Sequence, residues 1–307
     1  MTEFKTSVPL YYQSFSCIAD RCEHNCCIGW DIEIDSDTLD YYGTLKGKTA
    51  DRIMQNISPD GCFVMSPEGR CPLLGKAGLC DIIKEYGEGA LCSICADHPR
   101  FRNFYTDFCE MGLGMCCEEA ARIILGFKEP FSIKPTENAK VTAEERAFFK
   151  VRQNVFSMLQ DRQKSMLSRM ETVAEEFGFE FSDFCLNELC SLYSSLERLD
   201  NVWTEQLKML LDFEFSSDFF TREDIQLPFE QLACYFIFRH FGREEGNYYS
   251  PVCFALAGCY MIGALCSAQL QAHGTLTLCD ISEYARMYSA EIEYSEENTD
   301  ILFNYWN

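Results

Sequence analysis

The chain contains 307 residues, of which 47% are hydrophobic and 24% are charged, and its formal net charge at pH 7 is −22. This composition is that of a folded globular protein, and the length allows a substantial core divided over two lobes. Because the charge is strongly negative and no basic stripe runs along the sequence, we expect no nucleic-acid partner.

The N-terminal segment, "MTEFKTSVPLYYQSFSC", has no basic start followed by an apolar block and a small-residue cleavage site. We therefore expect no secretion and a cytoplasmic location. In a reducing compartment, dense cysteines indicate metal or redox chemistry more than disulfide bonds. The odd total of 19 cysteines also argues against a fully paired disulfide framework.

Short elements are expected between Cys17 and Cys117, because Gly, Pro and Cys interrupt the apolar runs there. The stretch "WDIEID" at residues 30–35 alternates apolar and acidic residues, which predicts a short strand with one apolar face. Its acidic face is either solvated or available to bind a lysine ammonium. A helix is expected within residues 41–57, and another begins with the acidic residues of "CCEEAARIILGF" at 116–127.

Twelve of the 19 cysteines lie within the first 117 residues, in four loops at 17–27, 71–80, 92–95 and 116–117 and at a few positions between them. Thiolate sulfur is the preferred donor for zinc and for iron–sulfur centres, which hold together loops that cannot pack alone. This grouping predicts a bound metal or cluster. The alternative is buried, inert thiols. That alternative better accounts for the cysteines beyond residue 117, namely Cys185, Cys190, Cys234, Cys253, Cys259, Cys266 and Cys279.

Sulfur ligation suits either tetrahedral zinc or an iron–sulfur cluster. The front part offers more thiols than one zinc ion needs, which favours iron–sulfur, with zinc as the alternative. The C-x3-C-x2-C spacing of radical enzymes is not met, because residue 29 is Gly, so we infer no radical chemistry. His24 could serve as a fourth ligand. His98 could be a ligand or a proton carrier, although a polar residue that braces the turn before Pro99 is the preferred interpretation.

Helical patterns dominate after residue 141. The segment 128–141 is predicted to be a linker, because prolines interrupt any regular pattern in "KEPFSIKPTEN". Thr142 and Glu145 fit a capping box, and apolar residues recur at helical spacing beyond it. We expect a mainly α protein in three parts: an irregular, metal- or cluster-stapled cysteine-rich lobe with short strands (1–127), the linker (128–141) and an α-helical bundle (142–307).

One segment, residues 251–274, carries no Asp, Glu, Lys or Arg and is long enough to span a bilayer. It is rich in small residues, contains Gln269 and Gln271, and has no cluster of Lys or Arg on either side. A buried helix of the bundle is therefore the favoured interpretation, and no membrane partner is expected. The nucleotide-binding and hydrolase motifs G-x-G-x-x-G, Walker A, G-x-S-x-G and H-E-x-x-H are absent from the sequence.

Three stretches follow one another in an order that points to a family: "SCIADRCEHNCCIGWDIEID" (16–35), "GRCPLLGKAGLCDIIKEYGEGALCSICADHPRF" (69–101) and "GMCCEEAARIIL" (114–125). They closely resemble the flagellin lysine-N-methylase (FliB) family. The similarity continues through "CYFIFRHF" (234–241) and "YSAEIEYSEEN" (288–298). A weaker resemblance, limited to the cysteine region, is to small zinc- or iron-chelating cysteine-cluster domains.

The resemblance implies a set of metal ligands. Matched residue by residue, the family's cysteine pattern falls on Cys17, Cys22, Cys26, Cys27, Cys71, Cys80, Cys95 and Cys117. Cys62, Cys92, Cys109 and Cys116 look like additions of this chain.

The resemblance also implies an activity, namely transfer of methyl groups from S-adenosylmethionine to lysines of flagellin in the cytoplasm. Aromatic side chains can hold the sulfonium and ammonium cations of such a reaction, and the candidates in the front part are Trp30, Tyr41, Tyr42 and Tyr105, each of which is otherwise a packing residue. The alternative from another class is a non-enzymatic metal- or redox-sensing cysteine-cluster protein.

Overall fold

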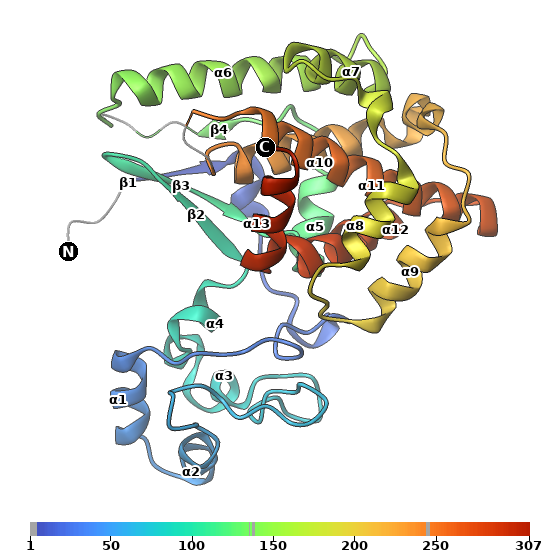
Figure 1. Cartoon of the computed structure of the whole chain (residues 1–307). Coiled ribbons are helices and arrows are strands. Elements are labelled where there is room, and N and C mark those ends of the chain that lie inside the picture. Colours follow the sequence, from blue (N-terminus) through green and yellow to red (C-terminus); the bar gives the residue numbers. More distant parts are fainter. Residues whose placement is uncertain (1–4, 135, 137–138, 244–245) are drawn as a thin grey trace. The chain divides into compact units, whose positions relative to one another are not determined.

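The structure is a computed structural model that describes residues 5–134, 136, 139–243 and 246–307. The chain divides into two compact units (Figure 1). Unit 1 comprises Met1–Phe15, Phe101–Cys116 and Ala120–Asn307, and unit 2 comprises Ser16–Arg100 and Cys117–Glu119. Unit 2 is narrower than the front lobe of residues 1–127 proposed from the sequence. Residues 1–4 of that lobe and residues 135 and 137–138 of the proposed linker lie outside the described part.

Unit 2 is built from short helices joined by long loops. The helices are α1 (Ser36–Thr44), α2 (Lys48–Gln55), α3 (Asp81–Tyr86) and α4 (Ser93–Asp97), with 3-10 turns at Ala19–Arg21 and Glu88–Ala90. The expected helix within 41–57 is thus two helices, α1 and α2. The expected strand at 30–35 is only a single antiparallel bridge from Glu33 to Cys62. The alternation itself is confirmed, because Ile32 and Ile34 are buried.

A small apolar cluster lies at the centre of unit 2. Its buried members are Ile32, Ile34, Tyr42, Ile53, Phe63, Cys71, Leu73, Leu74, Ile82, Ala90 and Cys92, and Cys27, Cys80 and Cys95 pack against it. Cysteines therefore form part of the core of this unit. Because hydrophobic stabilisation scales with the apolar surface removed from water, this small core contributes less to stability than the larger interior of unit 1.

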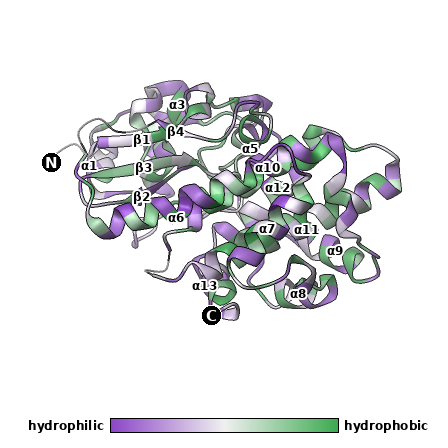
Figure 2. Cartoon of the chain, turned by 90° about the horizontal axis from the view of Figure 1, so that it is seen from above, coloured by the Kyte–Doolittle hydropathy of each residue, from purple (hydrophilic) through white to green (hydrophobic). Residues whose placement is uncertain are grey.

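Unit 1 contains a small mixed sheet. Its strands are β1 (Lys5–Pro9), β2 (Arg100–Phe104), β3 (Phe108–Leu113) and β4 (Ile133–Lys134), in the order β2-β3-β1-β4. β1 pairs in parallel with β3, with Lys5 opposite Phe108, and antiparallel with β4, with Val8 opposite Lys134. Five of the six residues of β3 are buried, and most of the strand is hydrophobic (Figure 2). Part of the proposed linker is thus a strand of this sheet.

Helices form the rest of unit 1, so the expectation of a mainly α protein is confirmed. They are α5 (Glu118–Leu125), α6 (Ala143–Leu159), α7 (Met166–Glu176), α8 (Leu186–Ser194), α9 (Asn201–Leu211), α10 (Gln226–His240), α11 (Tyr249–His273), α12 (Leu278–Tyr288) and α13 (Glu296–Tyr305). A π-helical turn at Ser289–Glu293 joins α12 to α13, and 3-10 turns lie at Leu10–Ser14, Phe181–Asp183, Ser217–Thr221 and Glu223–Ile225.

The predicted capping box at the start of α6 is confirmed. The Glu145 amide donates to Thr142 Oγ1 at 3.1 Å, and the Thr142 amide donates to Glu145 Oε2 at 2.8 Å. Two of the amides that lack a helical partner are satisfied in this way.

The long uncharged helix α11 passes through the middle of unit 1. Within the described residues it is the one helix whose length and composition would suffice to cross a membrane, and 94% of its most apolar window is buried inside the protein. It contacts α7, α8, α9, α10, α12 and α13. Its small residues allow this close packing, since Gly263 lies directly against the ring of Phe220. The interpretation as a buried helix is therefore confirmed.

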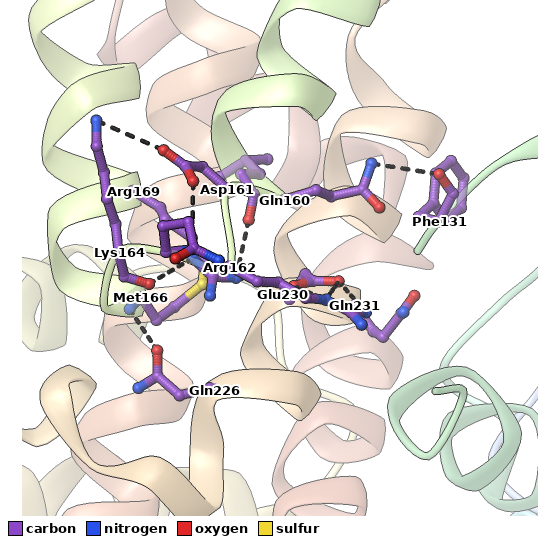
Figure 3. A network of polar contacts seen from close by, with 12 residues as sticks. Phe131, Gln160, Asp161, Arg162, Lys164, Met166, Arg169, Gln226, Glu230 and Gln231 are labelled. Atoms are coloured by element: carbon purple, nitrogen blue, oxygen red, sulfur yellow. Dashed lines mark hydrogen bonds and ion pairs between the residues drawn. The ribbon is translucent and has the colours of Figure 1, made fainter. Parts of the chain in front are cut away.

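A buried carboxylate ties α10 to α7 and to the segment between α6 and α7 (Figure 3). Glu230 is 1% exposed, and its oxygens accept hydrogen bonds from Arg169 at 2.8 Å and from Arg162 at 2.7 Å. Arg169 also donates to the Leu159 carbonyl. Because both charges of the Glu230–Arg169 pair are out of water, removing one partner would leave the other uncompensated.

Candidate functional site

Six thiols of unit 2 lie close together, and we call them the thiol cluster: Cys26, Cys27, Cys71, Cys80, Cys92 and Cys95. The backbone brings the first two loops together, because the Cys71 amide donates to the Cys27 carbonyl at 2.8 Å and the Gly29 amide donates to the Gly69 carbonyl at 2.8 Å. Gly69 has φ +67°, a left-handed backbone conformation in which any residue with a side chain would be strained.

The sulfur atoms of the cluster interact in two groups. The Cys27 thiol is hydrogen-bonded to both Cys26 and Cys71, and Cys92 is hydrogen-bonded to Cys95. The groups are near enough to influence each other electrostatically, since Cys95 is affected by both Cys71 and Cys26. Cys80 is likewise affected by Cys71.

These contacts lower the pKa of some thiols and raise the pKa of others. The hydrogen bond from Cys27 lowers the pKa of Cys26 and of Cys71 to about 7. The same hydrogen bonds raise the pKa of Cys27. The hydrogen bond between Cys92 and Cys95 lowers the pKa of Cys92 and raises that of Cys95. Burial raises the pKa of Cys80. The thiolate, the form that binds metals, is therefore favoured at Cys26, Cys71 and Cys92 and disfavoured at the other three thiols of the cluster.

The third loop is held in place by α1. The Asp35 carboxylate caps α1 by accepting from the Thr38 amide at 3.0 Å, and its other oxygen accepts from the Ser93 amide at 2.8 Å. These hydrogen bonds hold the pKa of Asp35 below its usual value. Asp35 thus fixes the start of α4, where Cys92 and Cys95 lie, rather than offering a face to a lysine. Cys92 was set aside in the sequence, although its CxxC spacing could have identified it.

A second, smaller group contains Cys22, Cys117 and Glu118. Glu118 Oε2 accepts from the Glu23 amide at 2.9 Å, from the His24 amide at 3.3 Å and from the Cys22 thiol at 3.6 Å. Burial and the negative charge of Glu118 raise the pKa of Cys22 to about 12, with a smaller contribution from Cys117.

Cys17 belongs to neither group. It is exposed, and its sulfur accepts from the Ala19 amide at 3.4 Å. The eight cysteines predicted as metal ligands are therefore divided between the thiol cluster, the Glu118 group and this exposed position.

The donor chemistry of the thiol cluster fits a metal–thiolate centre. All 19 cysteines are free thiols, so none of the predicted ligands is consumed by a disulfide. In the described residues, no three His, Cys, Asp or Glu side chains are arranged closely enough to hold a metal ion. The thiols thus supply the right atoms, with five of them in or against the core of unit 2 and Cys26 exposed, but they do not form a closed coordination sphere.

The other candidates from the sequence include residues whose burial and contacts assign them a structural role. Burial lowers the pKa of His98 to about 4, so its imidazole is neutral at pH 7. Tyr42 is buried in the core of unit 2, and Tyr105 donates to Glu110 at 3.0 Å and packs on Phe108. Tyr41 is 43% exposed. Packing, the default interpretation, accounts for Tyr42 and Tyr105.

A buried polar network in unit 1 was not identified from the sequence. We call it the Glu293 network. α10 contributes Tyr235, Arg239 and His240, and the π-helical turn contributes Glu293. Glu293 Oε1 lies 2.6 Å from His240 Nε2, and the Tyr235 hydroxyl donates to Glu293 Oε2 at 3.0 Å. Arg239 donates to the Tyr235 hydroxyl at 2.8 Å.

Within the Glu293 network, the Glu293 carboxyl group is charged at pH 7 and the His240 imidazole is neutral. Burial alone would raise the pKa of Glu293, but Arg239 and the hydrogen bond from His240 hold it below its usual value. Burial lowers the pKa of His240, so its imidazole is neutral at pH 7. The Arg239 guanidinium also lies over the rings of Phe101, at 4.9 Å, and Tyr294, at 4.6 Å.

The network joins three of the stretches that carry the family resemblance. Tyr235, Arg239 and His240 lie in 234–241, Glu293 lies in 288–298, and the Met115 amide of 114–125 donates to the Tyr235 hydroxyl at 3.1 Å. Motifs that are far apart in the sequence are thus packed against one another within unit 1. His240 is 4% exposed and central to this contact.

Comparison with known proteins finds relatives named for lysine methylation and for flagellar biosynthesis. Two curated proteins named lysine-N-methylase, from Salmonella typhimurium and Salmonella choleraesuis, are 27% and 25% identical to this chain over 216 and 220 residues. Each match covers 64% of this chain and 54% of the relative, so the chain spans about half the length of these relatives.

A third relative is shorter. The flagellar biosynthetic protein FliU of Salmonella muenchen is 31% identical over 134 residues, which are 41% of this chain and 79% of that protein. No family model matches the chain, and no solved structure matches it.

Proposed function

The chain belongs to the lysine-N-methylase (FliB) family, and on this premise we propose that it is a protein-lysine N-methyltransferase that uses S-adenosylmethionine and acts on flagellin in the cytoplasm. The observation that carries the proposal is the match to two proteins named lysine-N-methylase over 64% of this chain. The name of the third relative, a flagellar biosynthetic protein, supports flagellin as the substrate.

The proposed reaction is a displacement at the sulfonium methyl group. A neutral lysine amine attacks the methyl carbon, the new C–N bond forms as the C–S bond breaks, and S-adenosylhomocysteine leaves. Holding nitrogen, methyl and sulfur in line supplies most of the catalysis. A lysine at its usual pKa of about 10.4 is protonated at pH 7, so a base or a desolvated site must remove that proton first.

We further propose that unit 2 binds a metal centre, iron–sulfur with zinc as the alternative. Cys26, Cys27, Cys71, Cys80 and Cys95 would hold it through their thiolates, and the contacts between the Cys92 and Cys95 thiols add Cys92 to this set. The remaining proposed ligands, Cys17, Cys22 and Cys117, lie outside the cluster. When bound, such a centre would supply strong sulfur–metal bonds to loops that otherwise share a small core.

A second candidate function is metal or redox sensing without catalysis. The observation that favours it is the gathering of free thiols in a small unit, two of them, the exposed Cys26 and the buried Cys71, with a pKa of about 7. It requires no methyl donor. The two functions therefore differ in whether S-adenosylmethionine binds.

The test is to incubate the purified protein with flagellin and S-adenosylmethionine and to measure the flagellin by mass spectrometry. The proposal predicts mass increments of one methylene group each, located on lysine residues. S-adenosylhomocysteine in place of the methyl donor is the matched control and gives no increment.

The melting temperature separates the two functions when flagellin is left out. Ligand binding to the native state raises stability with ligand concentration. Methyltransferase function predicts a rise with S-adenosylmethionine, whereas sensing alone predicts none. Unmodified flagellin together with an unchanged melting temperature would contradict the proposed function.

A further inference from the structure

An aromatic pocket of about 200 Å³ lies in unit 1, and neither the Glu293 network nor the thiol cluster contributes residues to it. Five rings line it: Phe179, Phe184, Tyr249, Tyr305 and Trp306. Phe179 meets Phe184 edge to face at 5.9 Å and Tyr249 edge to face at 5.5 Å. Tyr305 and Trp306 are also edge to face, at 5.6 Å. The rings therefore present their faces in several directions.

Two carboxylates share the wall with these rings. Asp183 ends the 3-10 turn Phe181–Asp183, and Glu188 lies in the first turn of α8. Asp183 Oδ2 accepts from the Glu180 amide at 3.0 Å, which fixes its side chain. Asp183 is near enough to Tyr249 to contribute to the raised pKa of that phenol, after burial and Cys253.

No cation neutralises these carboxylates within the described part of the chain. None of the described lining residues is Lys, Arg or His, and no ion pair involves Asp183 or Glu188 there. The first turns of α8 and α11 lie at the pocket, and each helix start carries about +0.5 charge. Two full negative charges outweigh these partial charges, so the pocket as a whole favours a cation.

The floor and the size of the pocket restrict the ligand further. Leu189 and Cys253, at 3% and 1% exposure, form an apolar floor. Pockets for drug-sized ligands run from about 300 to 1,000 Å³, so this one is small for a nucleoside such as S-adenosylmethionine. A long aliphatic stem that ends in one ammonium group matches both the floor and the wall.

We propose that this pocket binds the side chain of a lysine in the protein substrate, with its monomethyl and dimethyl forms preferred. Aromatic faces attract an alkylammonium more strongly as methyl groups replace its hydration. Asp183 and Glu188 accept hydrogen bonds from the N–H that these forms retain and that trimethyllysine lacks. The inference rests on the proposed function only in naming a protein lysine as the source of the cation.

The test measures binding alone, without methyl donor or flagellin. The probes are Nα-acetyl-lysine methylamide in its unmethylated, monomethyl, dimethyl and trimethyl forms, and an uncharged analogue of the dimethyl form in which carbon replaces the ammonium nitrogen. Each is titrated into the full-length protein and followed by ligand-observed NMR. We expect the dimethyl form to bind about tenfold more tightly than the uncharged analogue, and more tightly than the trimethyl form.

Variants connect this binding to the pocket. Asp183→Asn combined with Glu188→Gln should weaken dimethyllysine binding about tenfold, and Tyr249→Leu about two- to tenfold. Asn at position 183 can still accept from the Glu180 amide, and Tyr249 is 40% exposed, so both variants should fold. The matched controls, Glu175→Gln on α7 and Tyr41→Leu in unit 2, should leave binding unchanged.

Three results would overturn the proposal. Equal binding of the uncharged analogue would show an apolar pocket without charge recognition. Tighter binding of the trimethyl form would show that the carboxylates do not recognise the ligand through its N–H group. The absence of saturable binding by any ammonium probe would remove the site. Flagellin methylation by a protein that binds no probe would contradict the lysine pocket and leave the proposed function intact. Probe binding without flagellin methylation would support the pocket and contradict the proposed function.

Discussion

The two units of this protein are held together by different means. Unit 1 has a continuous apolar interior around α10 and α11, with buried ion pairs of Glu230 with Arg169 and of Glu293 with Arg239. Unit 2 has short helices, isolated bridges and a small core in which two thiols are buried and three more pack against it.

The difference shows what each unit requires in order to fold. Burial of apolar surface scales with the size of a unit, so the larger unit 1 has enough of it to offset the loss of chain entropy. Unit 2, with the 85 residues Ser16–Arg100 and the three residues Cys117–Glu119, lies just above the length of about 70–80 residues below which domains commonly need a disulfide or a metal, and its apolar core is small. All of its cysteines are free thiols, which leaves the proposed metal centre as the source of that stability.

The largest expected effect is a loss of stability in unit 2 that leaves unit 1 folded. If metal–thiolate bonds hold unit 2, removing the metal with a chelator should cost it on the order of 10 kcal/mol, since the metal-binding free energy is also folding free energy. Limited proteolysis and hydrogen exchange should then show unit 2 unfolded and unit 1 protected. The substitution Cys71→Ser should act in the same direction, whereas Cys266→Ser, in the core of α11, should not affect the metal content. Equal protection of both units after chelation would contradict the comparison.

The next effect is confined to unit 1. Glu230→Ala leaves the Arg169 guanidinium, which is 3% exposed, buried without its partner, and should cost about 3–5 kcal/mol in urea unfolding. The control is Glu205→Ala on α9, because Glu205 and Lys208 form an exposed pair worth at most about 1 kcal/mol. Combining Glu230→Leu with Arg169→Met should recover much of the loss. A cost for Glu230→Ala no larger than the control would show that the ion pair is unimportant.

A smaller effect tests the packing of α11. In an exposed helix, Gly→Ala stabilises by about 1 kcal/mol. At Gly263 the added methyl group would overlap the ring of Phe220, and overpacking costs about 1–3 kcal/mol, so Gly263→Ala should destabilise unit 1. Gly43→Ala on α1 is the control, because nothing lies within 4 Å of the new methyl group there. Thermal unfolding of both variants measures the difference, and stabilisation by Gly263→Ala would mean that α11 packs loosely.

The smallest effect is a dependence on pH. His240 is neutral in the folded protein because burial lowers its pKa below 6.5, so the unfolded chain takes up the proton first as the pH falls. Glu293 favours the protonated ring and Arg239 and Arg243 oppose it, but burial dominates. Stability should therefore be complete above pH 6.5 and should decline below it, by at most about 1.4 kcal/mol for each pH unit.

Urea unfolding between pH 6.5 and 4.5, above the range in which Glu293 titrates, measures this slope. His240→Gln should reduce it, and His273→Gln, at the exposed end of α11, should not. An unchanged slope in His240→Gln would assign the acid sensitivity to other groups.

Local signals in the sequence predicted local features well. The capping box at Thr142, the buried character of α11 and the burial of Ile32 and Ile34 all follow from spacing within one element. The sheet could not be predicted in this way, because β1 pairs with β3 across about a hundred residues and its side chains show no long alternation. The strand expected at residues 30–35 forms only a single bridge at Glu33 for the same reason, since a strand needs a partner that the local pattern does not specify.

The candidate sites show the same limit. The spacing of the cysteines predicted loops rich in thiols, and the structure brings six of these thiols together, Cys92 among them. The Glu293 network could not be predicted, because its residues come from three distant segments and each has an ordinary local context. The order of the family motifs was the one signal in the sequence that pointed to it.

The most direct test of the comparison between the two units is the metal content of the protein purified without oxygen. Elemental analysis and an absorption spectrum, recorded on the same sample, give the identity and amount of the metal. A stoichiometric amount of iron with a brown chromophore, or of zinc without colour, is the predicted result. A metal-free protein in which unit 2 remains folded and protected from hydrogen exchange would contradict it.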